Sequence, residues 1–341
     1  MPRNISWKKG MRLTDEVLFA ADACTAEAIA QALTLGACGR FGLISSTERP
    51  FQIQLSVAKG FVDVEVLSCM AITKGGHIID AHFDTKFTNT FDGRVQIPAD
   101  LEQKEYFLTI NARPGQWKET AEGYREPDYS FALIGPQTKL PADAMPIARI
   151  VYEDGWREDA TKFVPPCLTI TAHPKFEELH MQLLQLLRKI SDTTSQQLDT
   201  AARTAISIYW PVVQQCYITA ATEHDTMTPQ QLQGCVQRMV GAFALACQMD
   251  EVLNLEDGPV FSNYALMPYS YTSAYQRIRQ GLGMCYAISE KVEKFSLLKI
   301  EPKPEPAPLP PPPEPAPTPE PVKPTPPPAF DPKRFWDGKR I

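Results

Sequence analysis

Apolar and polar residues alternate along several short runs in the first half of the chain. A strand with one buried face places an apolar side chain at every second position, and this period appears repeatedly here. The runs are residues 51–57, 62–72, 77–82, 106–112 and 129–133. Each is long enough for one strand of a sheet.

Turn signals separate these runs at Gly75-Gly76, Asp92-Gly93 and Asp154-Gly155. Glycine adopts positive φ without strain, so such pairs favour tight hairpins. Short strands joined by turns predict an antiparallel β-sandwich over residues 1–170. Residues 25–35 are the exception, because their alanine content favours a short helix with Thr25 as its N-cap.

From about residue 173 the apolar positions change to helical spacing. Four helices are expected, near residues 174–190, 198–212, 229–253 and 271–295. Pro174 suits a first helical turn, whereas Pro211 should kink or split the second helix. Thr228 and Gln231 have the spacing of a capping box at the start of the third. Residues 171–299 are therefore predicted to form a helical bundle.

The last helix carries an apolar seam with a spacing close to 3-4 alternation. Its members are Tyr275, Ile278, Leu282, Cys285 and Ile288. This seam could face its own bundle or an axis shared by three copies, and the own-bundle interpretation is preferred for most of it. Gly281 and Gly283 lie within the helix, which predicts tight packing or a bend there.

The C-terminal region is dominated by proline, with 17 of the 32 prolines after residue 300. Residues 300–329 should form a disordered, semi-rigid spacer that reaches roughly 90 Å at ~3.1 Å per residue. Residues 330–341 follow as a short peptide in which Phe330, Phe335 and Trp336 lie among four basic residues. Such a cluster favours a docking peptide over an inert terminus. The complete architecture is thus an α+β multidomain chain.

Composition narrows the functional classes. The 341 residues carry a net charge of −6, which disfavours a nucleic-acid binder. The sequence contains no run of 18 apolar residues, so neither a membrane span nor direct membrane insertion is expected. The N-terminus lacks the long apolar segment of a secretory signal. Eight scattered cysteines without a CxxC pair fit buried thiols in a reducing compartment. A cytoplasmic location is expected.

Candidate catalytic groups are sparse. His77 and His82 should point to opposite faces of a strand, and His173 and His180 have no ligands at metal-binding spacing. Cys167 could act as a nucleophile with a distant histidine, but its apolar surroundings favour burial. We therefore expect no enzyme activity, no cofactor and no metal, and the weak alternative is a hydrolase that uses Cys167 or a histidine.

Three segments resemble the TssK family, the baseplate subunit of type VI secretion systems. Residues 5–13 are similar to its opening Trp-x-x-Gly-Met-x-Leu pattern, and residues 69–79 to a strand-turn-strand of the family. Residues 145–168 are similar to its junction between the first domain and the helices, and include Pro165, Pro166 and Cys167. The resemblance covers about residues 4–297.

The resemblance implies a mechanical role. Family members resemble phage receptor-binding proteins: a β-sandwich shoulder packs on the baseplate wedge, the helices form a trimeric neck, and a C-terminal head meets the membrane complex. This chain would be a homotrimer linking wedge proteins to an anchoring or neighbouring complex. Trp7, Met11 and Leu13 are the candidate wedge contact, although Trp7 could instead staple the first strand to the sandwich.

The chain departs from the family after Leu298, where the proline tract replaces the head. The anchoring contact therefore does not carry over, and the tail is expected to reach a membrane-anchor or other baseplate component. Two alternatives remain open. One is a phage-tail-like adsorption protein whose sandwich binds a glycan or surface receptor, and the other is a proline-rich signalling adaptor.

Overall fold

The computed structural model describes residues 8–58, 60–82, 91–98, 103–119, 125–195, 203–249 and 258–295. The chain divides into two compact units, residues 1–300 and 301–341. Trp7, the proline tract and the peptide with Phe330, Phe335 and Trp336 lie outside the described residues. The architecture below is that of the first unit.

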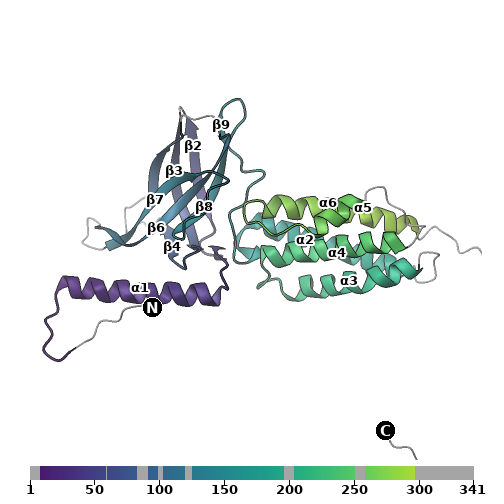
Figure 1. Cartoon of the computed structure of the whole chain (residues 1–341), viewed down its shortest axis with the longest axis horizontal. Coiled ribbons are helices and arrows are strands. Elements are labelled where there is room, and N and C mark those ends of the chain that lie inside the picture. The colour runs from purple at the N-terminus through teal and green to yellow at the C-terminus, as the bar shows by residue number, and fades with distance from the viewer. Residues whose placement is uncertain are drawn as a thin grey trace, which may run out of the picture. The chain divides into compact units, whose positions relative to one another are not determined.

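The first sheet is built around one long strand, β3 (Phe61–Ile72), which is labelled in Figure 1. Four shorter strands pair with it in antiparallel fashion: β1 (Gly42–Leu43), β2 (Gln52–Ala58), β4 (Ile78–His82) and β5 (Phe91–Gln96). Alternation along β3 buries Val62, Val64 and Val66 and leaves the intervening polar side chains on the outer face.

The second sheet has the strand order β7-β6-β8-β9. Its strands are β6 (Glu105–Glu119), β7 (Arg125–Ile134), β8 (Ala144–Tyr152) and β9 (Trp156–Glu158). The apolar faces of the two sheets share one core, so the predicted antiparallel sandwich is confirmed.

The turn predictions had mixed outcomes. Gly76 has φ +81° between β3 and β4, and Asp154 and Gly155 have φ values of 59° and 145° between β8 and β9. The prediction at Asp92-Gly93 was wrong, because both residues lie inside β5. A Cβ at Gly93 would lie 2.5 Å from Cδ2 of Phe131, so the glycine there makes room for a ring.

The N-terminal helix is twice as long as predicted. Helix α1 spans Asp15–Gly36, with Thr14 at the N-cap position. Thr25 lies in its middle and donates its hydroxyl to the carbonyl oxygen of Ala21 at 3.0 Å, so Thr25 is not a cap. Residues 15–24 of the helix were missed because no regular apolar period marks them.

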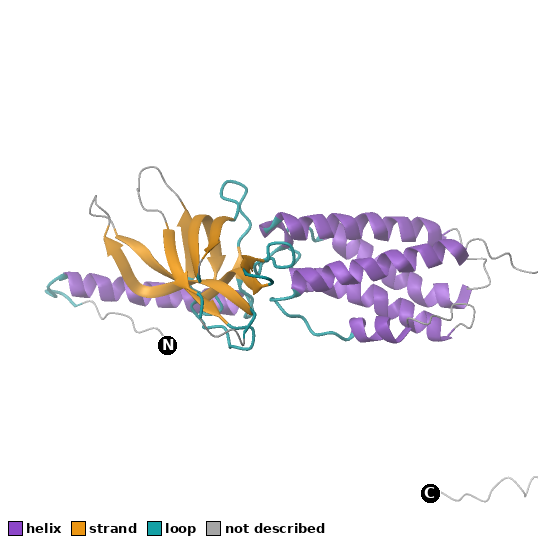
Figure 2. Ribbon diagram, turned by 90° about the horizontal axis from the view of Figure 1, so that it is seen from above, coloured by secondary structure: helices purple, strands orange, loops and turns teal. Residues whose placement is uncertain are grey.

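The helical half contains a 3-10 turn η1 (Ile170–Ala172) and helices α2 to α6, which run alongside one another in Figure 2. They are α2 (Pro174–Ser195), α3 (Arg203–Thr222), α4 (Pro229–Met249), α5 (Gly258–Ala265) and α6 (Ala274–Phe295). Helix α3 continues through Pro211 and is not split. Helix α5 was not predicted, because eight residues give too short a pattern.

The capping box is confirmed. The amide of Gln231 donates to Oγ1 of Thr228 at 3.1 Å, and the amide of Thr228 donates to Oε1 of Gln231 at 2.8 Å. Gly281 is packed tightly against Tyr264 and Val236, as expected, whereas Gly283 is exposed with open space around it.

Candidate interaction surfaces

The motif Pro165-Pro166-Cys167 joins the sandwich to the helices. The amide of Leu43 donates to the carbonyl oxygen of Pro166 at 2.8 Å, and the amide of Leu168 donates back to Leu43 at 2.9 Å. This short parallel ladder needs Gly42, which has φ +141° and whose Cβ would lie 2.5 Å from the Pro166 carbonyl carbon. The motif therefore fixes strand β1 at the entrance to the helical half.

Cys167 is buried within this ladder. Its Sγ donates to the carbonyl oxygen of Pro165 at 3.3 Å, and burial raises the pKa of the thiol well above its usual range. A thiol held in its neutral form is a poor nucleophile. Within the described ranges, no three His, Cys, Asp or Glu side chains are placed to hold a metal ion.

A cavity of about 290 Å³ opens beside Cys167, between the loop after α1 and the start of α4. Arg40 and Lys74 are the charged residues among those that line it, together with Tyr269 and Tyr271. The ring of Tyr271 meets Phe41 edge-on, with centroids 5.1 Å apart. The cavity is thus a basic, aromatic recess whose walls come from both halves of the described chain.

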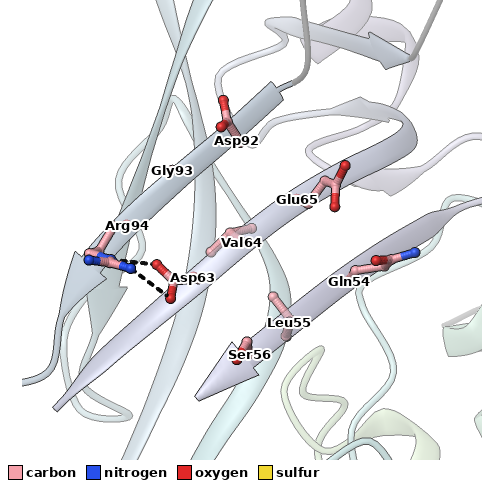
Figure 3. Close-up of a pocket in the computed structure, with 9 residues that line it drawn as sticks. All are labelled: Gln54, Leu55, Ser56, Asp63, Val64, Glu65, Asp92, Gly93 and Arg94. Atoms are coloured by element: carbon pink, nitrogen blue, oxygen red, sulfur yellow. Dashed lines mark hydrogen bonds and ion pairs between the residues drawn. The ribbon is translucent and has the colours of Figure 1, made fainter. Parts of the chain in front are cut away.

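A second depression of about 510 Å³ lies on the polar outer face of β2, β3 and β5 (Figure 3). Asp63 accepts two hydrogen bonds from Arg94, at 2.5 and 3.1 Å, which hold the pKa of the Asp63 carboxyl below its usual value. Glu65 lies directly opposite Asp92 across the ladder. None of the nine lining residues is aromatic, although the exposed ring of Phe61 lies beside Arg94 on the same face of β3.

Helix α1 exposes an apolar surface. Leu18, Phe19, Ile29 and Leu35 are 46%, 41%, 45% and 79% exposed, and Ala30 is the residue that the helix buries. Met11 and Leu13, the described members of the predicted wedge contact, are 38% and 65% exposed just before it. Contiguous exposed apolar residues of this kind mark interaction sites.

Helix α1 is also long and apolar enough to cross a membrane, judged by length and composition alone, with 6% of its apolar window buried. This finding was not anticipated from the sequence, where Asp22 and Glu27 interrupt the apolar residues. The helix carries four carboxylates and no basic residue. An acidic helix suits an apolar, basic protein surface better than anionic lipid.

The apolar seam of α6 lies inside its own chain. Ile278, Leu282, Cys285 and Ile288 are buried in the helical core. Tyr275, at the start of the seam, is half-buried and meets the ring of Phe176 edge-on at 6.2 Å.

The cysteines are more diverse than expected. Six are buried, but Cys38 is exposed and Cys24 is half-buried, so the expectation of buried thiols was wrong for these two. The sequence analysis also missed that Cys216 and Cys235 meet between α3 and α4, beside Arg238. A cysteine at a core position of each of two neighbouring helices was the available signal.

Residues 130–249 match the model of a bacterial type VI secretion family that includes EvfL, ImpJ and VasE. The matched region runs from β7 through the Pro165–Cys167 junction to the end of α4. No curated protein matches the sequence significantly.

Three solved structures share the fold. A crystal structure of TssK has a TM-score of 0.56 at 12% identity, covering 85% of this chain and 69% of that one. TssK from the EAEC type VI secretion system, bound to a nanobody, has a TM-score of 0.53 at 13% identity and covers 80% and 68%. A chain of a TssK–TssF–TssG baseplate subcomplex, solved by cryo-electron microscopy, has a TM-score of 0.52 at 14% identity. The match covers 85% of this chain and 100% of that one. The TM-scores establish a shared fold.

Proposed function

We propose that this chain, whose resemblance to the TssK family is confirmed by sequence and fold, is a structural subunit of a type VI secretion baseplate. The observation that carries the proposal is the family match over residues 130–249, which crosses the junction between sandwich and helices. The likeness to TssK in a baseplate subcomplex supports association with other baseplate proteins on the cytoplasmic side of the envelope.

Assembly into a homotrimer is part of this proposal. The helices α2 to α6 would form the neck, with faces other than the buried α6 seam meeting the neighbouring copies. Light scattering on a sizing column should give about three times the chain mass of 38.1 kDa. A monomer at micromolar concentration would count against a trimeric neck and leave assembly dependent on partners.

The N-terminal segment is proposed as the contact with the baseplate wedge, with Met11 and Leu13 continuing into the exposed apolar residues of α1. Exposed apolar side chains can be removed without loss of core packing. The double variant Met11→Asp/Leu13→Asp should therefore fold normally and lose co-purification with wedge proteins. Leu266→Asp is the matched control, because Leu266 is 84% exposed but lies after α5. Equal binding by both variants would place the wedge contact elsewhere.

The aromatic-basic peptide, residues 330–341, is proposed as the element through which the subunit is anchored. Replacing Phe330, Phe335 and Trp336 by alanine should abolish secretion and leave the trimer intact, since large aromatics dominate peptide docking. A second variant, in which Lys333 and Lys339 are replaced instead, tests whether positive charge or aromatic surface is needed for docking. If secretion is unchanged after the aromatic replacement, the tail is a spacer whose end binds no partner.

A further inference from the structure

Two thiols and a guanidinium meet where α3 packs against α4. The thiol of Cys216, in α3, donates to the carbonyl oxygen of Cys235 at 3.4 Å. Arg238 follows Cys235 by three residues in α4 and donates from Nη2 to the Cys235 sulfur at 3.3 Å. Cys216 and Cys235 are 1% and 0% exposed, whereas Arg238 is exposed.

This arrangement favours a thiolate at Cys235. A side-chain hydrogen bond between the Cys216 and Cys235 thiols, assisted by Arg238, holds the pKa of Cys235 below its usual value, although desolvation opposes the shift. The same hydrogen bond raises the pKa of Cys216. Two further groups act on the pair: the carboxylate of Glu223, beyond the end of α3, disfavours the thiolate, and Cys285 of α6 raises the pKa of Cys216.

Two other buried thiols behave differently. Burial is the main influence on Cys69, in β3, and raises its pKa to about 12, and burial raises the pKa of Cys285 as well. Reactivity follows the thiolate fraction. Cys235 therefore differs chemically from Cys69 and Cys285.

We propose that Cys216 and Cys235 form a redox-sensitive pair, which a peroxide converts to a reversible disulfide that ties α3 to α4. The Cys235 thiolate attacks one peroxide oxygen, the O–O bond breaks, and Cys235 becomes a sulfenic acid while the departing hydroxide takes a proton. The Cys216 sulfur then attacks the Cys235 sulfur, the S–O bond breaks, and the hydroxyl leaves as water with the Cys216 proton. Two thiols and one peroxide thus give one disulfide and two waters.

The exposed side chain of Arg238 lies beside the buried pair and marks the surface nearest to it. Local opening between α3 and α4 would admit a small peroxide from that side. The closed ring would include the turn between α3 and α4, so the bond should restrict the unfolded bundle.

The test treats the full chain with hydrogen peroxide, blocks remaining thiols after unfolding, and maps the peptides by mass spectrometry without reduction. A Cys38→Ser background removes the exposed thiol, which could cross-link two chains. We expect a Cys216–Cys235 cross-linked peptide that dithiothreitol reverses, together with a higher unfolding temperature. Free Cys216 and Cys235 after treatment, or oxidation of Cys69 at the same rate, would overturn the proposal.

Arg238 supplies a second readout that does not disturb the core. In Arg238→Gln the rate of cross-linking at pH 7 should fall several-fold, and its pH profile should move to higher pH as the thiolate loses its cation. Dimedone should trap a sulfenic acid at Cys235 in Cys216→Ser. An unchanged pH profile in Arg238→Gln would assign Arg238 a merely structural role and contradict the activated thiolate.

Discussion

Gly281 lies where α6 passes Tyr264 of α5. A Cβ at this position would overlap the hydroxyl and ring of Tyr264 and Cγ1 of Val236. The Tyr264 hydroxyl also donates to the carbonyl oxygen of Arg277 at 2.8 Å, so the ring is fixed and cannot easily yield. At the scale of single residues, the bundle therefore depends on the absence of one side chain.

The variant Gly281→Ala should lower the free energy of unfolding by about 1–3 kcal/mol, because overpacking in a filled core outweighs the gain in helix propensity. Gly283→Ala is the matched control in the same helix, since a Cβ there meets nothing. It should be neutral or stabilise by up to about 1 kcal/mol. Urea unfolding of both proteins measures the difference, and equal values would show that Tyr264 moves aside.

His173 is a second residue with a position-specific role. Its Nδ1 accepts a hydrogen bond from the amide of Lys175 at 3.2 Å, at the start of α2. Desolvation, and then the charge of Lys175, lower its pKa from 6.5 to about 4. The imidazole therefore caps the helix in its neutral form and resists protonation.

This shift gives a pH dependence with a defined sign. Above pH 6.5 the ring is neutral in both the folded and the unfolded chain, so it adds nothing to the pH dependence of stability. As pH falls from 6.5 towards 4, the unfolded chain binds a proton that the folded chain does not, so stability decreases. His173→Asn keeps an acceptor and cannot titrate, so it should remove this loss, about 3 kcal/mol between pH 7 and 4. His82→Asn is the control, and identical pH profiles for His173→Asn and wild type would contradict the assignment.

Secondary-structure elements were predictable where local chemistry alone determines them. The Thr228–Gln231 box begins α4 as expected, because both of its hydrogen bonds are made within four residues. Strands β2 and β3 were predicted correctly because the alternation of apolar and polar residues is itself a local pattern. Proline at 211 did not split α3, because packing against neighbouring helices supports the helix through that position.

Elements and contacts that depend on distant residues were not predictable. Gly93 resembles a turn residue, yet it lies in β5 because Phe131 of the other sheet needs the space. The meeting of Cys216 with Cys235 likewise depends on how α3 packs on α4. For the candidate wedge contact, the sequence indicated Met11 and Leu13 but not the exposed length of α1 that follows them.

At the scale of elements, the capping box provides a direct test. Thr228→Ala should destabilise the chain by about 1 kcal/mol, because it leaves the amide of Gln231 without its side-chain acceptor. Gln230→Ala, at the exposed neighbouring position, should be nearly neutral. Thermal unfolding of the two variants, followed by far-ultraviolet circular dichroism, measures the difference in stability. A Thr228→Ala protein as stable as Gln230→Ala would mean that water replaces the cap.

At the scale of the whole molecule, the sandwich and the helices are joined by short-range contacts within residues 1–300. Leu43 exchanges hydrogen bonds with Pro166 and Leu168, and the amide of Ile170 donates to the carbonyl oxygen of Met227 at 2.8 Å. Phe41 packs on Tyr271, and buried residues of both halves form one continuous cluster. The two halves are therefore linked by backbone hydrogen bonds, by an aromatic pair and by a shared core.

These contacts predict that residues 1–300 unfold in one cooperative transition, and that Gly42→Ala separates the halves. A Cβ at residue 42 would collide with the Pro166 backbone, and the φ of +141° is unfavourable for any residue except glycine. The ladder between Leu43 and Pro166 would open, and calorimetry should then resolve two transitions, one for the sheets and one for the helices. Gly36→Ala, in open space at the end of α1, should keep the single transition. If Gly42→Ala also unfolds in one step at a lower temperature, the shared core and not the ladder couples the two halves.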